Sequence, residues 1–133
     1  MLVSDPAGAE GDDLSWLRQF GTSGQDEAEA VAADRSGASW VVGMTSGALD
    51  GQGSAGTVDA FNRHYGPDGT ERWTRQFGSW DNDVAKGVSV DHAGNAYVVG
   101  QTFGALPGQA SAGGWDAYVR KFDPSGGEVW TRQ

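Results

Sequence analysis

The side chains best suited to chemistry in this sequence are carboxylates and aromatic rings near the ends of expected strands. The run Trp80-Asp81-Asn82-Asp83 places three oxygen-bearing side chains within four residues. Because hard oxygen ligands suit Ca²⁺, Asp81 and Asp83 are the candidate metal ligands and calcium is the candidate cofactor. The spacing is not that of an EF-hand, however, and a solvated acidic turn is the favoured interpretation, so no cofactor is expected apart from this candidate calcium ion.

Trp80 and Trp115 are the candidate ligand-binding residues. Both flank expected strands, and aromatic rings in such loops are common at ligand-binding faces, where they can stack on sugar rings. Packing within the fold is the competing interpretation. A ligand site is therefore expected at the loop ends and not on the strands.

Paired carboxylates could also support glycoside hydrolysis. The pairs of the right type are Asp26 with Asp83, Asp34 with Asp91, and Asp59 with Asp116. Each residue has its equivalent 57 positions away, whereas a catalytic residue is needed only once. Asp34 and Asp91 open Asp-x-x-Gly turns, in which an aspartate caps backbone N–H groups. No nucleophile, base or phosphate-binding pattern accompanies them, so no catalytic residue is predicted and the chain is not expected to be an enzyme.

The chain contains an internal repeat of 57 residues. Trp16, Trp73 and Trp130 are spaced 57 apart, and residues 16–72 align with residues 73–129 without a gap. In this alignment 28 of the 57 pairs are identical. Identity at that level in one register indicates duplication of a single structural unit.

Each unit has the composition and pattern of short strands joined by turns. The chain has 22 Gly and 4 Pro together with 11% aromatic residues, which favours an all-β protein. The turn at residues 92–95 precedes an apolar stretch around Val98, and a long loop of small residues follows it. The expected strands are residues 27–33, 38–45, 58–65, 70–77, 84–90, 95–102, 115–122 and 127–133.

Four antiparallel strands in every 57 residues are typical of a β-propeller blade. A blade is apolar on both faces because it lies between neighbours, which explains the adjacent Val41-Val42 and Val98-Val99. A β-sandwich is the alternative, but it gives no reason for near-identical units. The expected inter-blade core comprises Val31, Val41, Val42, Val88, Val98, Val99, Trp73, Phe77 and Tyr97.

Three segments together resemble the bacterial SBBP repeat, the seven-bladed beta-propeller repeat. They are residues 73–78 (WTRQFG), 91–102 (DHAGNAYVVGQT) and 116–123 (DAYVRKFD). The resemblance covers roughly residues 14–133, with Trp40 in place of Tyr97 and Asn62 in place of Val119 in the first copy. It implies large, often secreted or surface-attached bacterial proteins, most of them without an assigned biochemical role.

The phase of the repeat divides the chain into three parts. Residues 1–19 are expected to be the end of a preceding blade with its outer strand, residues 20–77 one blade and residues 78–133 a second. Two blades cannot close a ring, so we expect a segment of a longer array, with a ring of several chains as the alternative. The strand expected at Leu14–Phe20 is equivalent to the C-terminal strand and could exchange with it between molecules.

Charge and composition exclude some classes of binding partner. With 18 acidic and 9 basic residues the net charge is −9, which argues against nucleic acid and anionic membrane surfaces. There is no cysteine, no signal peptide in the sequence and no run long enough for membrane insertion.

The sequence thus favours a non-catalytic interaction or scaffold module, extracellular or on the bacterial cell surface. Its partners would be a protein or glycan ligand, neighbouring blades of the parent array, or another copy of itself. The propeller portion of a glycan-acting enzyme and a fragment that assembles into a ring remain as alternatives.

Overall fold

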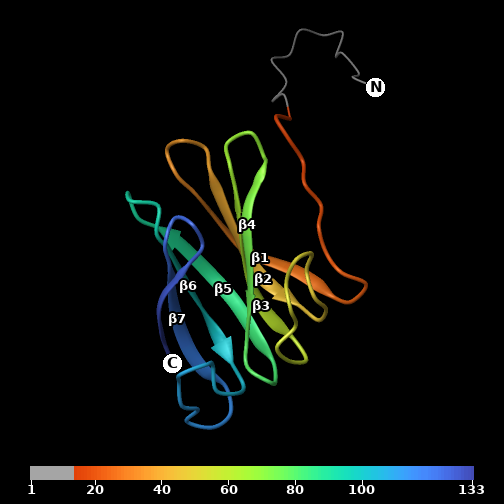
Figure 1. Cartoon of the computed structure of the whole chain (residues 1–133), viewed down its shortest axis with the longest axis vertical. Coiled ribbons are helices and arrows are strands. Elements are labelled where there is room, and N and C mark those ends of the chain that lie inside the picture. The colour runs from red at the N-terminus through yellow and green to blue at the C-terminus, as the bar shows by residue number, and fades with distance from the viewer. Residues whose placement is uncertain (1–13) are drawn as a thin grey trace, which may run out of the picture.

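The computed structural model describes residues 14–133 and contains two four-stranded antiparallel sheets that lie side by side (Figure 1). The strand order is β1-β2-β3-β4 in the first sheet and β5-β6-β7-β8 in the second. The strands are β1 (Asp26–Ala33), β2 (Ser39–Thr45), β3 (Asp59–Tyr65), β4 (Glu71–Phe77), β5 (Asp83–Val90), β6 (Ala96–Thr102), β7 (Asp116–Phe122) and β8 (Glu128–Arg132).

Every strand lies within one residue of its expected bounds. The all-β prediction, with sheets of the kind that form propeller blades, is confirmed. Among residues 14–133 there is no helix, and hence none long and apolar enough to cross a membrane.

The Asp-x-x-Gly segments form the predicted capped turns. Asp34 Oδ1 accepts hydrogen bonds from the backbone N–H groups of Ser36 and Ala38 at 2.9 and 3.2 Å. Asp91 Oδ1 accepts the equivalent bonds from Ala93 and Asn95 at 2.9 and 3.0 Å. Together with the Asn95 side-chain amide, these donors stabilise the carboxylate and lower the pKa of Asp91 to about 2. These two aspartates therefore have a structural role in shaping the turns.

A repeated glycine lets the first two strands of each sheet approach closely. The pairing of β1 with β2 shifts register between Ala28 and Ala30, and that of β5 with β6 shifts between Ala85 and Gly87. At this bulge a Cβ on Gly100 would overlap the carbonyl oxygen of Val84. Gly43 is matched to Gly100 in the first sheet and meets Glu27 in the same way. Only glycine fits such a backbone contact.

The main core lies between the two sheets. We call the face that carries Val41 or its equivalent Val98 the leading face of a sheet, and the face that carries Val42 or Val99 the trailing face. The trailing face of the first sheet packs on the leading face of the second. The buried residues of this junction include Trp40, Val42, Ala60, Trp73, Phe77, Ala85, Ala96, Val98, Tyr118 and Phe122.

The prediction of the core residues is partly wrong. Val42, Val98, Trp73 and Phe77 are buried as predicted, and Val88 packs against the core. Val31, however, is 66% exposed and Val99 is 48% exposed.

The reason is that Val31 lies on the leading face of the first sheet and Val99 on the trailing face of the second, where no described strand covers them. Val41 and Tyr97, on the same two faces, are only half-buried.

The junction contains one titratable ring without a hydrogen-bond partner. His64 stacks on Trp40 with ring centroids 4.2 Å apart, and Trp73 lies 5.3 Å away on β4. Neither imidazole nitrogen has a hydrogen bond within the described residues. Burial, reinforced by the positive charge of Arg72, lowers the pKa of His64. The ring is thus held neutral between two tryptophans.

The valine pair on β6 gives a test of the packing. We expect Val98→Asp to lower the free energy of unfolding by about 3–5 kcal/mol, because it buries an unpaired charge in the junction. The neighbouring Val99→Asp should change it by no more than about 0.5 kcal/mol, since that side chain reaches solvent. Denaturant unfolding measures both, and equal effects of the two variants would contradict the assignment of faces.

His64 predicts a loss of stability in mild acid. Its folded-state pKa is lower than that of the unfolded chain, so the unfolded state binds more protons as the pH falls below about 6.5. The free energy of unfolding should therefore decrease between about pH 7.5 and pH 5.5, and His64→Leu should reduce that decrease. The exposed His92→Gln is the control. An identical pH profile for His64→Leu and the wild type would refute the role of this ring.

Candidate functional site

The contact that joins the sheets is built from the fourth strand of one and the third strand of the other. Phe77 on β4 meets the rings of Tyr118 and Phe122 on β7, with centroids 5.8 and 5.7 Å apart. The guanidinium of Arg120 lies 4.3 Å from the centre of the Phe77 ring. Arg120 Nε also donates to Thr131 Oγ1 at 2.7 Å. A buried arginine is thus held by its own sheet and covered by an aromatic ring of the preceding one.

The same contact occurs a second time, between residues 14–20 and the first sheet. Phe20 meets Phe61 at 5.5 Å, and the guanidinium of Arg63 lies 3.9 Å from the Phe20 ring centre. Trp16 packs on Tyr65 at 5.7 Å. Each of these residues precedes its counterpart in the sheet junction by 57 positions.

Residues 14–20 therefore pack on the first sheet as β4 packs on the second, and Figure 1 shows the segment running alongside that sheet. They carry no strand assignment, because no described strand pairs with them. The expected outer strand at Leu14–Phe20 is thus absent as a hydrogen-bonded strand, although Trp16 and Phe20 pack on the first sheet as Trp73 and Phe77 pack on the second. The rest of the predicted segment 1–19, residues 1–13, lies outside the described residues.

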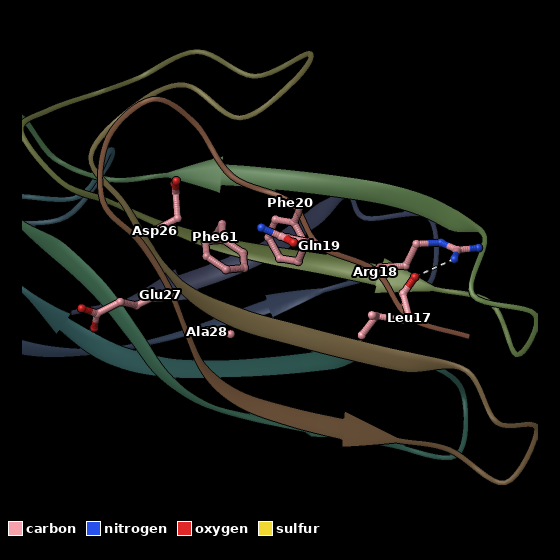
Figure 2. Close-up of a pocket in the computed structure, with 8 residues that line it drawn as sticks. All are labelled: Leu17, Arg18, Gln19, Phe20, Asp26, Glu27, Ala28 and Phe61. Atoms are coloured by element: carbon pink, nitrogen blue, oxygen red, sulfur yellow. Dashed lines mark hydrogen bonds between the residues drawn. The ribbon is translucent and has the colours of Figure 1, made fainter. Parts of the chain in front are cut away.

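A groove opens beside this segment on the leading face of the first sheet (Figure 2). It has a volume of about 380 Å³ and is lined by Leu17, Arg18, Gln19, Phe20, Asp26, Glu27, Ala28 and Phe61. Ala28 is exposed in the groove, whereas its counterpart Ala85 is fully buried. On the second sheet, strand β5, which carries Ala85, contacts β1, β2 and β3 of the preceding sheet. The groove corresponds to the space that those strands fill at the junction.

The trailing face of the second sheet is uncovered in the same sense. It carries Tyr97, Val99, Val119, Lys121 and Trp130. Val42 is fully buried and Trp40 is 2% exposed, yet their counterparts Val99 and Tyr97 remain accessible. Residues 14–133 thus contain one satisfied junction and two faces of the same kind that no described sheet covers.

A second candidate site lies at the end of the second sheet where β4 connects to β5 and β6 to β7. Trp80 is 73% exposed, Trp115 48% and Phe103 41%. Phe103 and Trp115 form an edge-to-face pair with centroids 5.4 Å apart and planes at 79°. A Cβ on Gly104 would lie 3.2 Å from Trp80 Nε1, so the Trp80 indole lies against the backbone next to Phe103. We call Trp80, Phe103 and Trp115 the aromatic cluster.

The structure brings the two predicted tryptophans to the same loop end, through a residue that the sequence analysis missed. Phe103 directly follows the last residue of β6, at the start of the predicted loop of small residues. Its counterpart in the first copy is Ser46, while those of Trp80 and Trp115 are Ser23 and Val58. A comparison of the two copies at every loop position would have found all three.

The two predicted calcium ligands occupy different environments. Asp83 is fully buried, and its Oδ2 accepts hydrogen bonds from the backbone N–H and hydroxyl of Ser79 at 2.6 and 3.1 Å. Burial raises the pKa of Asp83. Asp81 is half-buried and its Oδ1 accepts from the backbone N–H of Asn82 at 2.9 Å. No group of three or more His, Cys, Asp or Glu side chains suited to a metal ion occurs in residues 14–133.

The remaining repeated carboxylates fix loops. Asp59 accepts hydrogen bonds from the backbone N–H groups of Ala55 and Gly56 at 2.7 and 2.9 Å and from Gln76 Nε2 at 2.8 Å. Asp116 accepts from Ala112 N and from Gln133 Nε2. These aspartates tie the long loop to the start of the third strand in each sheet.

Comparisons with known proteins agree with this architecture. Residues 72–106 match the SBBP family model, a beta-propeller repeat, which confirms the resemblance over that segment. The matched residues run from β4 across the junction into β6 and the loop that follows it. The chain is also 36% identical over 76 residues to the regulatory protein FlaEY of Caulobacter vibrioides, an alignment that covers 55% of this chain. It spans only 8% of the length of that relative.

The repeated Phe–Arg contact can be tested by truncation. Phe77→Ala should lower the free energy of unfolding by about 3–5 kcal/mol, because it removes a ring buried against Tyr118, Phe122 and Arg120. Phe20→Ala should have a clearly smaller effect, since Phe20 is half-exposed beside the open groove. Thermal unfolding of both variants checks this. A larger loss for Phe20→Ala would contradict it.

Proposed function

We propose that this chain is a non-catalytic β-propeller repeat segment that serves as an interaction or scaffold module outside the cell or on the surface of a bacterium. The uncovered faces carry the proposal. A face that is buried at the internal junction is open at both ends of the described structure, with Val31 and Val99 in solvent. Such faces are built to receive further blades.

The chemistry of the junction supports docking of like units. Trp73 Nε1 donates to the carbonyl of Pro124 at 3.0 Å, and Arg75 Nε donates to that of Gly126 at 2.8 Å. The trailing face of the second sheet carries Trp130 and Arg132 at the matching positions. It therefore offers the same two donors to the turn of a following unit.

An ion pair between the first strands of the two sheets favours the same head-to-tail arrangement of units. Lys86 Nζ on β5 lies 2.7 Å from Glu29 Oε1 on β1, and these two residues occupy the same position in the two copies. A head-to-tail neighbour would place another Glu29 beside Lys86. The charges at this position are thus complementary between units, although an exposed pair contributes only about 0–1 kcal/mol.

A scaffold role is further supported by the repeated carboxylates. Asp34, Asp59, Asp91 and Asp116 each accept two or more backbone or side-chain hydrogen bonds that shape turns and loops. The surface location is supported by the resemblance to SBBP repeats. A regulatory role, as the name of the FlaEY relative states for that protein, would be exerted by such a module through its contacts with partners.

Open faces predict self-association of the isolated chain. The exposed apolar face residues should pair between molecules, and the net charge of −9 opposes this only within a Debye length of about 8 Å at 0.15 M salt. Light scattering should show a mass that rises with concentration in the micromolar range. The double variant Val31→Asp, Val99→Asp should reduce that mass while unfolding as cooperatively as the wild type.

A wild-type chain that stays monomeric and well folded at tens of micromolar would refute the docking role of the faces. Phe103→Ser is the matched control. This substitution removes an exposed apolar side chain at the loop end, away from both open faces, and introduces the residue that the first copy carries at the same position.

A further inference from the structure

Among residues 14–133 the exposed large apolar residues include aliphatic side chains, such as Val31 and Val99 on the two open faces. At the loop end they are all aromatic: Trp80, Phe103 and Trp115. Missing neighbours explain the exposure of the two valines, since Val42, the equivalent of Val99, is buried at the internal junction and Val88, the equivalent of Val31, packs against its core. The aromatic cluster has a different origin.

The fold does not require these three rings. The first copy forms the same sheet and the same loops with Ser23, Ser46 and Val58 at the matching positions. Two of the three counterparts are small polar residues. The rings are thus an addition specific to the second copy, placed where the backbone is already determined by repeated residues.

The loops that carry the rings are held rigidly. Phe103 N donates to the carbonyl of Asn82 at 2.9 Å, and Asp83 N donates to that of Val58 at 2.8 Å. The buried carboxylate of Asp83 fixes Ser79, whose hydroxyl in turn accepts from Asp81 N at 3.2 Å. Rings on such a frame are arranged before a ligand arrives, which reduces the entropy lost on binding.

The charges around the cluster restrict the ligand. Residues 78–82 and 103–115 contain no lysine or arginine, whereas Asp81 and Asp116 lie next to the two tryptophans in sequence. An anionic ligand would be repelled. The Asn82 side chain and the second oxygen of Asp81 have no hydrogen-bond partner among residues 14–133, so polar groups next to Trp80 in the chain remain available to a ligand.

We propose that the aromatic cluster binds a neutral carbohydrate. One face of a pyranose ring presents C–H groups with partial positive charge, which suits the negative face of an indole or phenyl ring. The hydroxyl groups at the rim of the sugar can bond to Asp81 and Asn82. Flat, exposed rings with carboxylate and amide side chains nearby in the chain fit such a ligand better than an apolar peptide. The assignment names a ligand for the module proposed above and rests on that interaction role.

The test compares the full chain with a variant that carries the residues of the first copy. Trp80→Ser, Phe103→Ser and Trp115→Val are combined, since the first copy shows that this backbone accepts them. Leu17→Thr is the control, because it removes an exposed apolar residue outside the cluster. Affinity electrophoresis in gels containing hydroxyethyl cellulose, laminarin or glycol chitin detects binding without using tryptophan fluorescence.

We expect the wild type and Leu17→Thr to be retarded by at least one of these neutral polysaccharides. The triple variant should migrate as in the polymer-free gel, while its melting temperature stays close to that of the wild type. Each single substitution should raise the Kd by about tenfold.

Three outcomes would overturn the assignment: no retardation by any polymer, equal retardation of the triple variant, or displacement of bound polymer by choline, which would identify a site for cations. A loss of folding in the triple variant would show that the rings serve packing and would also overturn it. None of these results affects self-association through the sheet faces, so failure of the carbohydrate site and failure of the proposed docking role are distinguishable.

Discussion

The structure depends on one contact, between the phenylalanine of a fourth strand and the buried arginine on the third strand of the following sheet. Arg120 is only 4% exposed, and its charge is tolerated because Thr131 accepts a hydrogen bond from it, Glu128 forms an ion pair with it at 3.8 Å, and the Phe77 ring covers its other side. Neither sheet could provide all of these partners alone. The contact therefore links the folding of one unit to the presence of its neighbour.

That dependence explains the position of residues 14–20. Arg63 has its own partners in Thr74 and Glu71, but it still requires an aromatic cover, and Phe20 provides it. The segment has the side chains of a fourth strand without the strand that would pair with it. Residues 14–20 cover the leading face at β3, where Phe61 and Tyr65 lie. The part of that face at β1, with Val31 and the groove at Ala28, remains in solvent.

Much of this architecture is predictable from the sequence because local signals repeat. Asp34 and Asp91 start capped turns, glycines allow positive φ after them, and alternation within each strand sets the two faces. Burial is less predictable. Val31 and Val88 are identical residues at matching positions, yet only the second packs against the core, since a neighbouring sheet covers it. The residue type alone therefore cannot predict that Val31 is exposed and Val88 is not.

Only part of the candidate ligand site was predictable from the sequence, because its third ring is recognised only from its spatial neighbour. Tryptophans stand out in any sequence, so Trp80 and Trp115 were identified, but Phe103 follows directly on a strand residue and resembles its continuation. Its role becomes visible only when the Trp115 ring is found 5.4 Å away. Of the two predicted calcium ligands, Asp83 is buried and fixes Ser79, whereas Asp81 is half-buried. A carboxylate engaged by the fold is a poor indicator of a ligand.

Comparison of the two copies distinguishes residues that the fold requires from residues that it does not. A single copy would not allow this distinction. Positions that keep their residue after 57 steps, such as Gly43 and Gly100 or Arg63 and Arg120, are those where the backbone approach or the junction contact allows no alternative. Some positions that differ, such as Ser23 and Trp80, lie where repeated residues already determine the backbone, so the fold does not require their residue type. His64 shows that such a difference can still lie inside the junction, where it changes the response to pH. The aromatic cluster shows the opposite case, in which the difference lies at a surface and the blade beneath it is unchanged. A repeat of this kind can therefore acquire a new binding surface on one unit without altering how the units assemble.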